Sequence, residues 1–591
     1  MAIHQLLLPR RLLLGFALFL FDSGCRDVAT VESLKSNPTP IPTDVETTQA
    51  TNTPALPLLT RSAAEKKTPQ SFHFLDVADR LGIRHQYQNG ALGQSLMVEA
   101  TGGGVAWFDY DGDGQLDLFF VQGGSVLGDS EAGRIPDALF RGQSDAGFVS
   151  VGPVAGLNDE EYSQGVAVAD FDNDGFDDVY VTGIHHNTLF QNQGDGTFLN
   201  VTAYSGVGES RWSTSAAWGD LDLDGDLDLY VCNYVDFDLT HPKICLRLNS
   251  KEPAMCNPKD FTPAPDECFE NLGDGTFQKV AQAWGLFGPG NRALGIAIAD
   301  FNNDSRPDIY VANDTTANFL FLNRSRGQFE ESATLLGCAL SAHGTGQASM
   351  GVAVGDYDRN GFLDLYLTHF AGEWNTLYRN LGPEGFQDRT ALAGLVAPTL
   401  AKLGFGTVMT DFDQDGQVEL LVANGHVDRG SGSEEYEMLP QLFTFLGRGF
   451  GECGSGAGDY FQTKRVGRGV GIGDYDNDGD WDFAVVHHNS PVAVLRNDCD
   501  RGHWLKLKTI GRIGARTPVG LRVKLRQGDL TLMQELAGGT SYCSAHESAL
   551  IFGVGQSSEP CELEVRWPMG QVQKIEGVLL DRTLLLLEPN K

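Results

Sequence analysis

The sequence predicts an all-β protein, a seven-bladed β-propeller followed by a small C-terminal β domain. Three observations predict this fold. A nine-residue acidic pattern recurs seven times, each copy lies between short runs of apolar and β-branched residues, and the 591-residue chain has 72 glycines without the strict period of collagen. Short strands that alternate with glycine-containing loops, in units of 50 to 80 residues, are typical of propeller blades.

Residues 1–24 are predicted to be an export signal. Two arginines precede an apolar run, residues 12–21, which is shorter than the roughly 20 residues of a membrane span. Ser23-Gly24-Cys25 is similar to the end of a bacterial lipobox and predicts lipidation of Cys25; ordinary signal cleavage, which discards Cys25, is the alternative. Residues 25–70 are rich in Thr, Pro and Ser and are expected to form an extended tether.

The acidic pattern Asp-x-Asp/Asn-x-Asp/Asn-Gly-x-x-Asp/Glu divides residues 71–498, the predicted propeller, into seven units. We name the copies loop 1 to loop 7 in chain order; they begin at Asp109, Asp170, Asp220, Asp300, Asp356, Asp411 and Asp474. Apolar runs on both sides of each loop predict strand, loop, strand. A second element recurs between the loops: an aromatic residue, then often Val-Ala or Val-Thr, then Gly-Leu, as at Phe277.

The ends of the repeated region predict a closed ring. One copy of the second element, Phe74-Leu75-Asp76-Val77-Ala78, precedes loop 1, whereas the seventh unit, which ends near Asn497, lacks a copy. A ring in which the N-terminal strand completes the last blade explains both facts. An open solenoid would need capping repeats at both ends, and the sequence shows none.

The spacing of acidic residues in the loops predicts several structural Ca²⁺ sites. Carboxylates at positions 1, 3, 5 and 9, a backbone carbonyl at position 7 and glycine at position 6 supply the hard oxygen ligands that Ca²⁺ takes. The predicted ligands are Asp109, Asp111, Asp113 and Asp117; Asp170, Asp172, Asp174 and Asp178; Asp220, Asp222, Asp224 and Asp228; Asp300, Asn302, Asp304 and Asp308; Asp356, Asp358, Asn360 and Asp364; Asp411, Asp413, Asp415 and Glu419; Asp474, Asp476, Asp478 and Asp482. Loops 4 and 5, with Asn302, Ser305 and Asn360 in the pattern, are expected to bind more weakly. Solvated acidic turns without a metal are the alternative.

The net charge of −35 follows mainly from these loops, which hold 29 of the 78 acidic residues. A chain this acidic is a poor partner for nucleic acid or for an anionic membrane surface. We therefore expect no nucleic-acid partner, and contact with a membrane only through the N-terminal lipid anchor.

Four cysteines, Cys232, Cys245, Cys256 and Cys268, fall in the longest interval between loops. In an exported chain they predict two disulfides, with three pairings open. A zinc knuckle is the alternative, although no Cys-x-x-Cys pair occurs.

Polar residues follow the strand after several loops and are expected on the face opposite the loops. They are His185, His186, Asp314, His369, His426, His487 and His488. One interpretation is a ligand or second metal site near the ring axis; the other is that these side chains stabilise blade junctions through hydrogen bonds. The sequence has no nucleophile elbow, zinc-protease, phosphate-loop or dinucleotide motif.

The acidic loops and their Gly-Val-Ala lead-ins resemble FG-GAP, or VCBS, repeats, as in integrin-type propellers. Residues 499–591 resemble the ASPIC/UnbV domain, which follows such repeats in the cartilage acidic protein family. The supporting motifs include Asn313-Asp314-Thr315-Thr316, Asn424-Gly425-His426-Val427, Gly502-His503-Trp504-Leu505, Gly538-Gly539-Thr540-Ser541-Tyr542, Phe552-Gly553-Val554-Gly555 and Trp567-Pro568-Met569-Gly570. The resemblance covers residues 72 to 588.

This resemblance implies an exported, calcium-binding protein, either secreted or held at the cell surface or outer membrane as a lipoprotein. It implies adhesion or interaction with an extracellular protein or glycan, and no enzymatic reaction. The alternative function is an extracellular hydrolase or lyase that acts on a polymer at the face opposite the loops. That alternative requires an acid, a base and substrate-orienting groups to converge on one face.

Overall fold

The computed structural model describes residues 72–590 apart from 126–133, 144–146 and 431–434. The predicted export signal, the tether and Cys25 lie outside the described residues. All described residues belong to one compact unit, Lys67–Lys591. Within them, no helix is long and apolar enough to cross a membrane.

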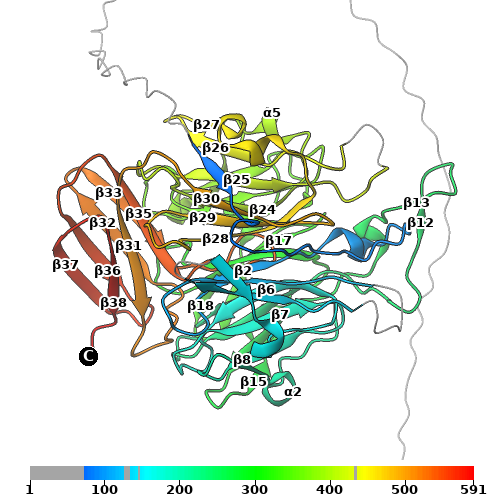
Figure 1. Ribbon diagram of the computed structural model, residues 1–591, viewed down its shortest axis with the longest axis horizontal. Coiled ribbons are helices and arrows are strands. Elements are labelled where there is room, and N and C mark those ends of the chain that lie inside the picture. Colours follow the sequence, from blue (N-terminus) through cyan, green and yellow to red (C-terminus); the bar gives the residue numbers. More distant parts are fainter. Residues whose placement is uncertain (1–71, 126–133, 144–146, 431–434, 591) are drawn as a thin grey trace, which may run out of the picture. The chain divides into compact units, whose positions relative to one another are not determined.

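Most of the chain forms seven antiparallel sheets, which we call the repeat sheets (Figure 1). Sheets 1 to 4 contain β2 (Val105–Phe108), β3 (Asp117–Phe120), β4 (Ala138–Gln143) and β5 (Gly147–Ser150); β6 (Ser163–Ala169), β7 (Asp178–Gly183), β8 (Thr188–Asn192) and β9 (Phe198–Asn200); β10 (Ser213–Gly219), β11 (Asp228–Asn233), β14 (Glu267–Asn271) and β15 (Phe277–Lys279); β16 (Ala293–Ala299), β17 (Asp308–Asn313), β18 (Phe319–Ser325) and β19 (Gln328–Glu331).

Sheets 5 to 7 repeat the arrangement, and in the last the fourth strand comes from the N-terminal end of the described chain. They contain β20 (Val352–Gly355), β21 (Asp364–Leu367), β22 (Thr376–Asn380) and β23 (Phe386–Asp388); β24 (Gly404–Thr410), β25 (Glu419–Asn424), β26 (Gln441–Phe445) and β27 (Phe450–Glu452); β28 (Gly467–Gly473), β29 (Asp482–His487), β30 (Ala493–Asn497) and β1 (Phe74–Asp76). β1 pairs antiparallel with β30, as the sequence predicts.

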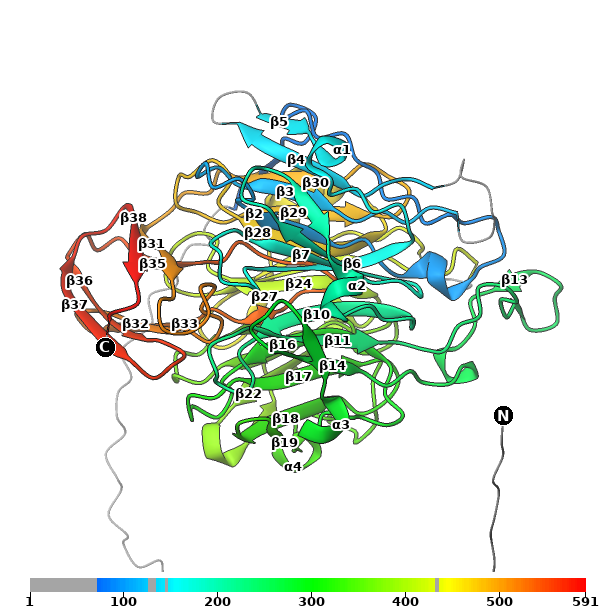
Figure 2. The ribbon, with the colours of Figure 1, turned by 90° about the horizontal axis from the view of Figure 1, so that it is seen from below.

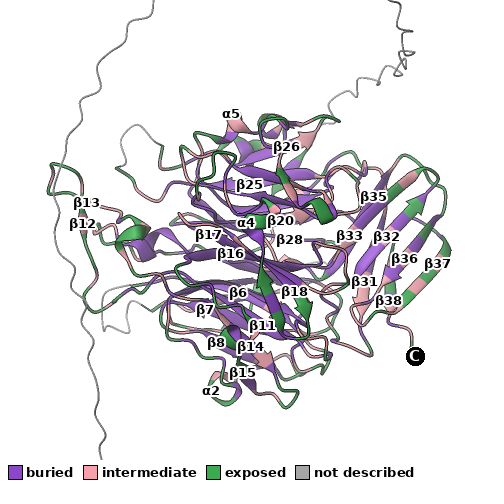
Figure 3. Ribbon diagram, turned by 180° about the vertical axis from the view of Figure 1, so that it is seen from behind, coloured by how far each residue is buried: buried purple, intermediate pink, exposed green. Residues whose placement is uncertain are grey.

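The first strands of the repeat sheets are rich in Gly, Ala and Val and are almost fully buried (Figure 3). The first strands of successive sheets contact one another from β2 through β28, and β28 also contacts β2. Glycine permits this close approach: a Cβ atom on Gly469 of β28 would lie 2.3 Å from the carbonyl oxygen of Gly103. Small residues at these strands therefore allow seven sheets to meet along their first strands.

The recurring Gly-Leu element is the end of a one-turn helix that follows the fourth strand. These helices are α1 (Gly152–Ala155), α2 (Thr202–Ser205), α3 (Ala281–Trp284) and α4 (Ala333–Leu336). A fifth one-turn helix, α5 (Val396–Thr399), instead follows its Gly-Leu pair, Gly394-Leu395. The first four end at a glycine in the left-handed conformation, such as Gly206 with φ of 80°. Only glycine takes this conformation without strain, which explains why the residue recurs at this position.

The long interval in sheet 3 forms a two-stranded hairpin, β12 (Cys245–Leu246) and β13 (Pro253–Ala254), which a disulfide between Cys245 and Cys256 closes. The other two cysteines of the interval, Cys232 on β11 and Cys268 on β14, are buried free thiols. The prediction of two disulfides was thus wrong for the second pair: both thiols are enclosed in the apolar core between sheets 3 and 4.

The C-terminal domain contains two further sheets on the side of the unit opposite the β12–β13 hairpin (Figures 1 and 2). One sheet has the order β35 (Ala549–Gly555), β31 (His503–Ile510), β38 (Arg582–Leu587). The other has the order β33 (Leu530–Glu535), β32 (Arg522–Gln527), β36 (Cys561–Arg566), β37 (Val572–Val578). Leucine and valine side chains from both sheets and Trp567 form a separate core, as expected for a small β domain.

Residues 537–549, which we call the inserted segment, leave the C-terminal domain and run between the repeat sheets. The segment includes β34 (Gly538–Gly539), which pairs with β16. It contacts the first strand of every repeat sheet: β2 through Ala545, β6 and β10 through Cys543, β16 through Gly538 and Gly539, β20 through Ser541, β24 through Tyr542, and β28 through Glu547. The sequence did not predict this insertion.

The close contact between Gly104 and the inserted segment allows a test of this packing. A Cβ atom on Gly104 would lie 2.0 Å from the carbonyl oxygen of Cys543, whereas a Cβ atom on Gly456 meets nothing within 4 Å. We expect Gly104→Ala to lower the free energy of unfolding by about 1–3 kcal/mol, because backbone must move, and Gly456→Ala to change it by less than about 1 kcal/mol. Denaturant unfolding of the two variants measures the difference, and equal stabilities would contradict the packing described.

Candidate metal centres in the acidic loops

Each acidic loop joins the first strand of a repeat sheet to the second, so all seven occupy equivalent positions. The carboxylate at position 1 folds the loop: in loop 7, Asp474 accepts the N–H groups of Asp478 at 3.0 Å and Gly479 at 3.1 Å. The same pair of bonds occurs in the other six loops. Position 6 takes a positive φ in every loop, and in loop 4 Ser305 does so with φ of 68° in place of glycine.

Positions 1, 3 and 9 bring three carboxylates together. In loops 1, 2, 3, 5 and 6, one oxygen from each of these residues lies within 4.8 Å of the others. Loop 6 is the most enclosed of these, with Asp411, Asp413 and Glu419 at 5%, 2% and 1% exposure. The residue at position 5 is not part of these groups; it accepts the N–H of position 7, as Asp113 does from Gln115 at 2.9 Å.

The carboxylate at position 9 ties the loop to the rest of its sheet. Asp178 accepts the N–H of Phe171, at position 2, at 3.0 Å, and the N–H of Asn192, on the third strand, at 2.7 Å. The equivalent pair of bonds occurs in five further loops. In loop 6 the longer Glu419 reaches the N–H of Phe412 and the hydroxyl of Thr444 instead.

An asparagine on the third strand links each of five sheets to the acidic loop of the preceding sheet. The side-chain amide of Asn192 donates to the carbonyl of Tyr110, in loop 1, at 2.8 Å. The same bond from one sheet to the previous loop joins Asn271 to Phe171, Asn323 to Leu221, Asn380 to Phe301 and Asn497 to Phe412. These asparagines were not predicted from the sequence, although an Asn two positions after Phe, Tyr or Leu recurs before the hairpin turn.

Burial makes the loop carboxylates hard to ionise. Burial, with repulsion from Asp111 and Asp109, raises the pKa of Asp117 to about 8, and burial with repulsion from Asp172 and Asp170 raises that of Asp178 to about 9. In loop 6, burial and mutual repulsion raise the pKa values of Asp411 and Glu419 well above their ordinary range. Three such groups need protons or a cation to offset their charge.

The donor set fits Ca²⁺. It consists of carboxylate oxygens, which are hard ligands, and a nine-residue loop brings three of them within 4.8 Å of one another. Positions 1, 3 and 9 would hold the ion, and the ion would supply the positive charge that lets these carboxylates stay ionised while buried. Loop 4 offers Asn302 at position 3, so it has one carboxylate fewer.

The seven residues of the predicted polar face are engaged in local contacts. His185 bonds the carbonyls of Ser210 and Phe237, and His487 bonds the hydroxyl of Tyr460 and the carbonyl of Pro491. His186, Asp314 and His369 bond the hydroxyls of Thr188, Tyr234 and Ser349, respectively. His426 bonds the backbone of Asp428, and the ring of His488 stacks on that of Tyr87. Burial lowers the pKa of His369 and of His487 to about 3, so both are neutral at pH 7.

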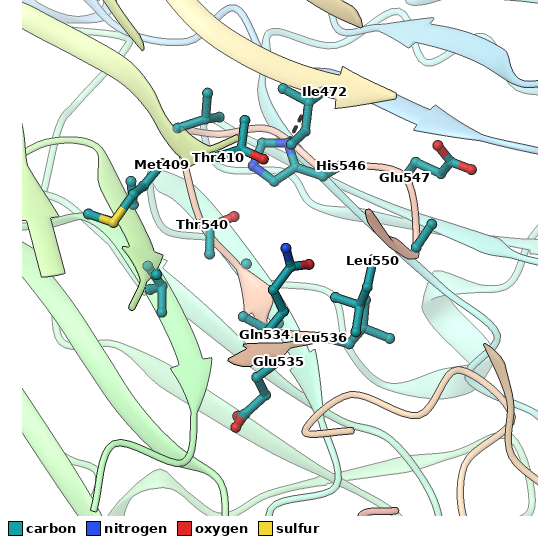
Figure 4. A pocket seen from close by; sticks show the side chains of 18 of the residues that line it. Met409, Thr410, Ile472, Gln534, Glu535, Leu536, Thr540, His546, Glu547 and Leu550 are labelled. Atoms are coloured by element: carbon teal, nitrogen blue, oxygen red, sulfur yellow. Dashed lines mark hydrogen bonds between the residues drawn. The ribbon is translucent and has the colours of Figure 1, made fainter. Parts of the chain in front are cut away.

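A cavity of about 210 Å³ lies between the first strands and the C-terminal domain (Figure 4). Met409 and Leu550 form part of its apolar wall, and Gln534 and His546 part of its polar wall. His546 accepts the N–H of Ile472 through Nδ1 at 3.2 Å, and burial lowers its pKa to about 4. The cavity thus contains a neutral imidazole that can donate from Nε2.

Comparison with protein families gives two matches. The FG-GAP-like repeat family matches residues 109–181, 170–231, 262–311 and 300–367, and the ASPIC and UnbV family matches residues 511–591. The first set contains loops 1 to 5, and the second contains most of the C-terminal domain with the inserted segment.

Curated relatives include cartilage acidic protein 1 of Homo sapiens, 27% identical over 287 residues, and that of Xenopus tropicalis, 26% identical over 322 residues. These alignments cover 47% and 52% of this chain and 41% and 46% of the two relatives. The chain thus spans less than half the length of the curated relatives it matches.

Solved structures with similar folds have low sequence identity. One is an Agrocybe aegerita lectin that recognises non-reducing terminal N-acetylglucosamine, with 15% identity, a TM-score of 0.39, and coverage of 67% of this chain and 87% of the lectin. Another is YCF48 bound to a D1 peptide, with 8% identity, a TM-score of 0.36, and coverage of 68% and 94%.

Removal of the asparagine link between two sheets is expected to lower the stability of the protein. Asn192 is 1% exposed and its amide donates to the carbonyls of Tyr110 and Asp177, whereas the adjacent Gln193 is exposed. Asn192→Ala leaves these buried groups without a partner and is expected to lower the free energy of unfolding by about 1–3 kcal/mol. Gln193→Ala should change it by less than about 0.5 kcal/mol. Denaturant unfolding compares the pair; a neutral Asn192→Ala would mean that the link does not stabilise the sheets.

The raised pKa values predict how stability depends on pH without metal. Because the folded-state pKa values of Asp220, Asp117 and Asp178, about 7, 8 and 9, exceed the ordinary 3.8, folding favours their protonated forms. This contribution is present at low pH and is lost as pH rises through about 7 to 9. The melting temperature of metal-free protein should therefore fall from pH 6 to about pH 9, and the increase caused by Ca²⁺ should grow over the same range. Melting curves at fixed ionic strength test both trends, and a metal-free melting temperature that rises with pH would contradict the assignment.

Proposed function

Since this chain carries FG-GAP-like repeats and an ASPIC and UnbV domain and is homologous to cartilage acidic protein 1, we propose that it is an exported, calcium-stabilised β-propeller that mediates interaction at the cell surface. Its partner would be an extracellular protein or glycan, and the chain would catalyse no reaction. The observation that carries this proposal is the convergence of three carboxylates in equivalent loops of successive repeat sheets.

A closed seven-bladed ring is part of the proposal. Three contacts support it: β28 of the last repeat sheet contacts β2 of the first, β1 pairs with β30, and the inserted segment contacts the first strand of every sheet. A single extended segment reaches seven strands most directly when those strands surround it. In such a ring each acidic loop faces the same side.

Calcium would act on stability and not on catalysis. Each ion would neutralise carboxylates that are buried and mutually repelling in the folded chain and solvated in the unfolded one. An ion present at about tenfold above its dissociation constant adds about 1.4 kcal/mol per site. Several loops together would contribute as much as the whole stability of an ordinary domain.

The surface available to a partner is limited by the chain itself. The C-terminal domain contacts loops 2, 4, 6 and 7, and the inserted segment runs along the first strands. The β12–β13 hairpin on the opposite side is more open, with Leu246 and Leu248 at 58% and 88% exposure. We therefore place partner binding on the side of the hairpin.

The alternative, a hydrolase or lyase acting on a polymer, has less support. It requires acid, base and orienting groups that converge on one face, whereas the predicted polar residues bond separate local partners. The proposed non-enzymatic role rests on this arrangement and on the homology.

Thermal unfolding of the exported chain tests the calcium proposal. With Ca²⁺ we expect the melting temperature to be higher by about 10 °C or more than with excess chelator, because several sites each add about 1.4 kcal/mol. Ca²⁺ should restore the loss better than Mg²⁺, which demands tighter octahedral geometry. Asp413→Asn, in loop 6, should reduce the calcium-dependent part of the shift, and Asp529→Asn, in the turn before β33 and outside the acidic loops, should leave it unchanged. No shift on chelation would refute the proposed role of calcium.

A further inference from the structure

Two acidic loops meet the C-terminal domain through the same arrangement of three side chains. In each, a basic residue of the domain approaches the position 1 aspartate, and an acidic residue of the domain binds both the basic residue and the backbone of that aspartate. We call these the loop 7 triad (Asp474, Lys506, Glu547) and the loop 4 triad (Asp300, Arg522, Glu535).

The loop 7 triad is fully enclosed. The ammonium of Lys506, on β31, is 0% exposed and lies 3.0 Å from Oδ2 of Asp474 and 2.7 Å from Oε1 of Glu547. The other oxygen of Glu547 accepts the N–H of Asp474 at 3.0 Å. Because Glu547 belongs to the inserted segment, this triad joins the last repeat sheet, the C-terminal domain and the inserted segment at one point.

The loop 4 triad repeats these contacts with an arginine. The guanidinium of Arg522, on β32, donates to Glu535 at 2.7 Å and to the carbonyl of Asp300 at 2.6 Å, and lies 3.8 Å from Oδ2 of Asp300. Glu535 accepts the N–H of Asp300 at 2.7 Å. Arg522 and Glu535 are both buried, so the pair is shielded from solvent.

The contact of the C-terminal domain with loop 2 lacks the buried cation that the two triads have. In loop 2, Arg516 lies 3.7 Å from Asp170, but its side chain is 45% exposed, and Thr517 takes the place of the acid that binds the position 1 N–H. No buried cation lies against that aspartate through the described contacts. Loop 2 is therefore a peripheral contact, whereas loops 4 and 7 receive a buried cation from the domain.

We propose that loops 4 and 7 are docking sites for the C-terminal domain. In these loops Arg522 and Lys506, respectively, supply the positive charge that calcium supplies in the other loops. This inference rests on the proposed calcium binding. A fixed cation about 3 Å from a ligand carboxylate repels a second cation, and burial strengthens that repulsion. Loop 7 therefore binds Ca²⁺ more weakly than loops 2 and 3, although its five aspartates make it one of the most acidic by sequence.

Terbium luminescence can report on loop 7 in the full exported chain. Trp481 occupies position 8 of this loop, and the ring of Trp504 lies against Gly479 at position 6. Excitation of tryptophan sensitises a lanthanide bound nearby, and the part of the signal lost in Trp481→Phe belongs to loop 7. Displacement of that signal by Ca²⁺ gives the loop 7 affinity, and calorimetry with Ca²⁺ gives the affinities of the whole set.

Lys506→Met is expected to tighten Ca²⁺ at loop 7 by at least about tenfold, because it removes the competing charge. Lys506→Arg keeps the charge and should leave the affinity near that of the original chain. Lys574→Met is the matched control: Lys574 pairs with Glu564 at 3.2 Å within the C-terminal domain and is 71% exposed, so its loss should change nothing at loop 7. Equal affinity in Lys506→Met and the original chain would overturn the proposal.

The unsubstituted chain provides a second test that does not depend on folding of Lys506→Met. Its loop 7 signal should saturate only after most calcium sites measured by calorimetry are filled. A loop 7 signal that saturates with the tightest sites would overturn the docking inference and leave the calcium proposal intact. Absence of calcium binding at all loops would instead refute the proposed function.

Discussion

The repeat sheets depend on the hydrogen bonds of one carboxylate, the one at position 9, which closes each acidic loop. It accepts one N–H from the start of the loop and, in six of the seven loops, one from the third strand, as Asp178 does from Phe171 and Asn192. It thereby fixes the loop, the second strand and the third strand together. The same carboxylate faces those of positions 1 and 3, so the bond that holds the sheet also creates a concentration of buried negative charge. The folding of the repeat and the need for protons or a cation in the loop both follow from this residue.

Neighbouring sheets are joined next to this carboxylate. In five sheets, the asparagine whose backbone N–H binds position 9 donates its side-chain amide to the preceding loop, so loops 1, 2, 3, 4 and 6 are held from both sides. Sheet 6 has Phe445 at this position, and its ring packs on Tyr357 of loop 5 with ring centroids 5.8 Å apart. Apolar packing thus replaces the hydrogen bond at that junction. A change in the charge of one of these loops therefore affects the stability of two sheets.

The inserted segment explains why the repeat sheets and the C-terminal domain form one unit. Extended backbone from residues 537–549 bonds the first strands of most repeat sheets, and Tyr542 packs on Phe405 of β24. Glycines such as Gly104 leave room for it. The domain therefore contributes to the centre of the repeat region as well as to its own core. The two triads add charged contacts at loops 4 and 7, where the domain meets the same carboxylates that form the candidate metal centres.

Much of the fold could be read from local sequence. Position 1, 3 and 9 carboxylates, glycine at position 6 and apolar runs on both sides determine each strand–loop–strand unit, because spacing along nine residues fixes which groups can converge. The missing last copy near Asn497 and the extra copy at Phe74 likewise indicated that the N-terminal strand joins the last sheet. The disulfide pattern was only half predictable, since pairing depends on the geometry that the fold gives the thiols: Cys245 bonds Cys256, whereas Cys232 and Cys268 remain free thiols in the core. The polar residues after the second strands looked alike in sequence, but each bonds a separate neighbour.

The sequence by itself thus determined the repeated unit and its ligand chemistry. Only the tertiary structure decided that residues 537–549 lie among the repeat sheets and that Lys506 and Arg522 enter loops 7 and 4, because these contacts join residues 32 or more than 200 positions apart, beyond the reach of any local pattern.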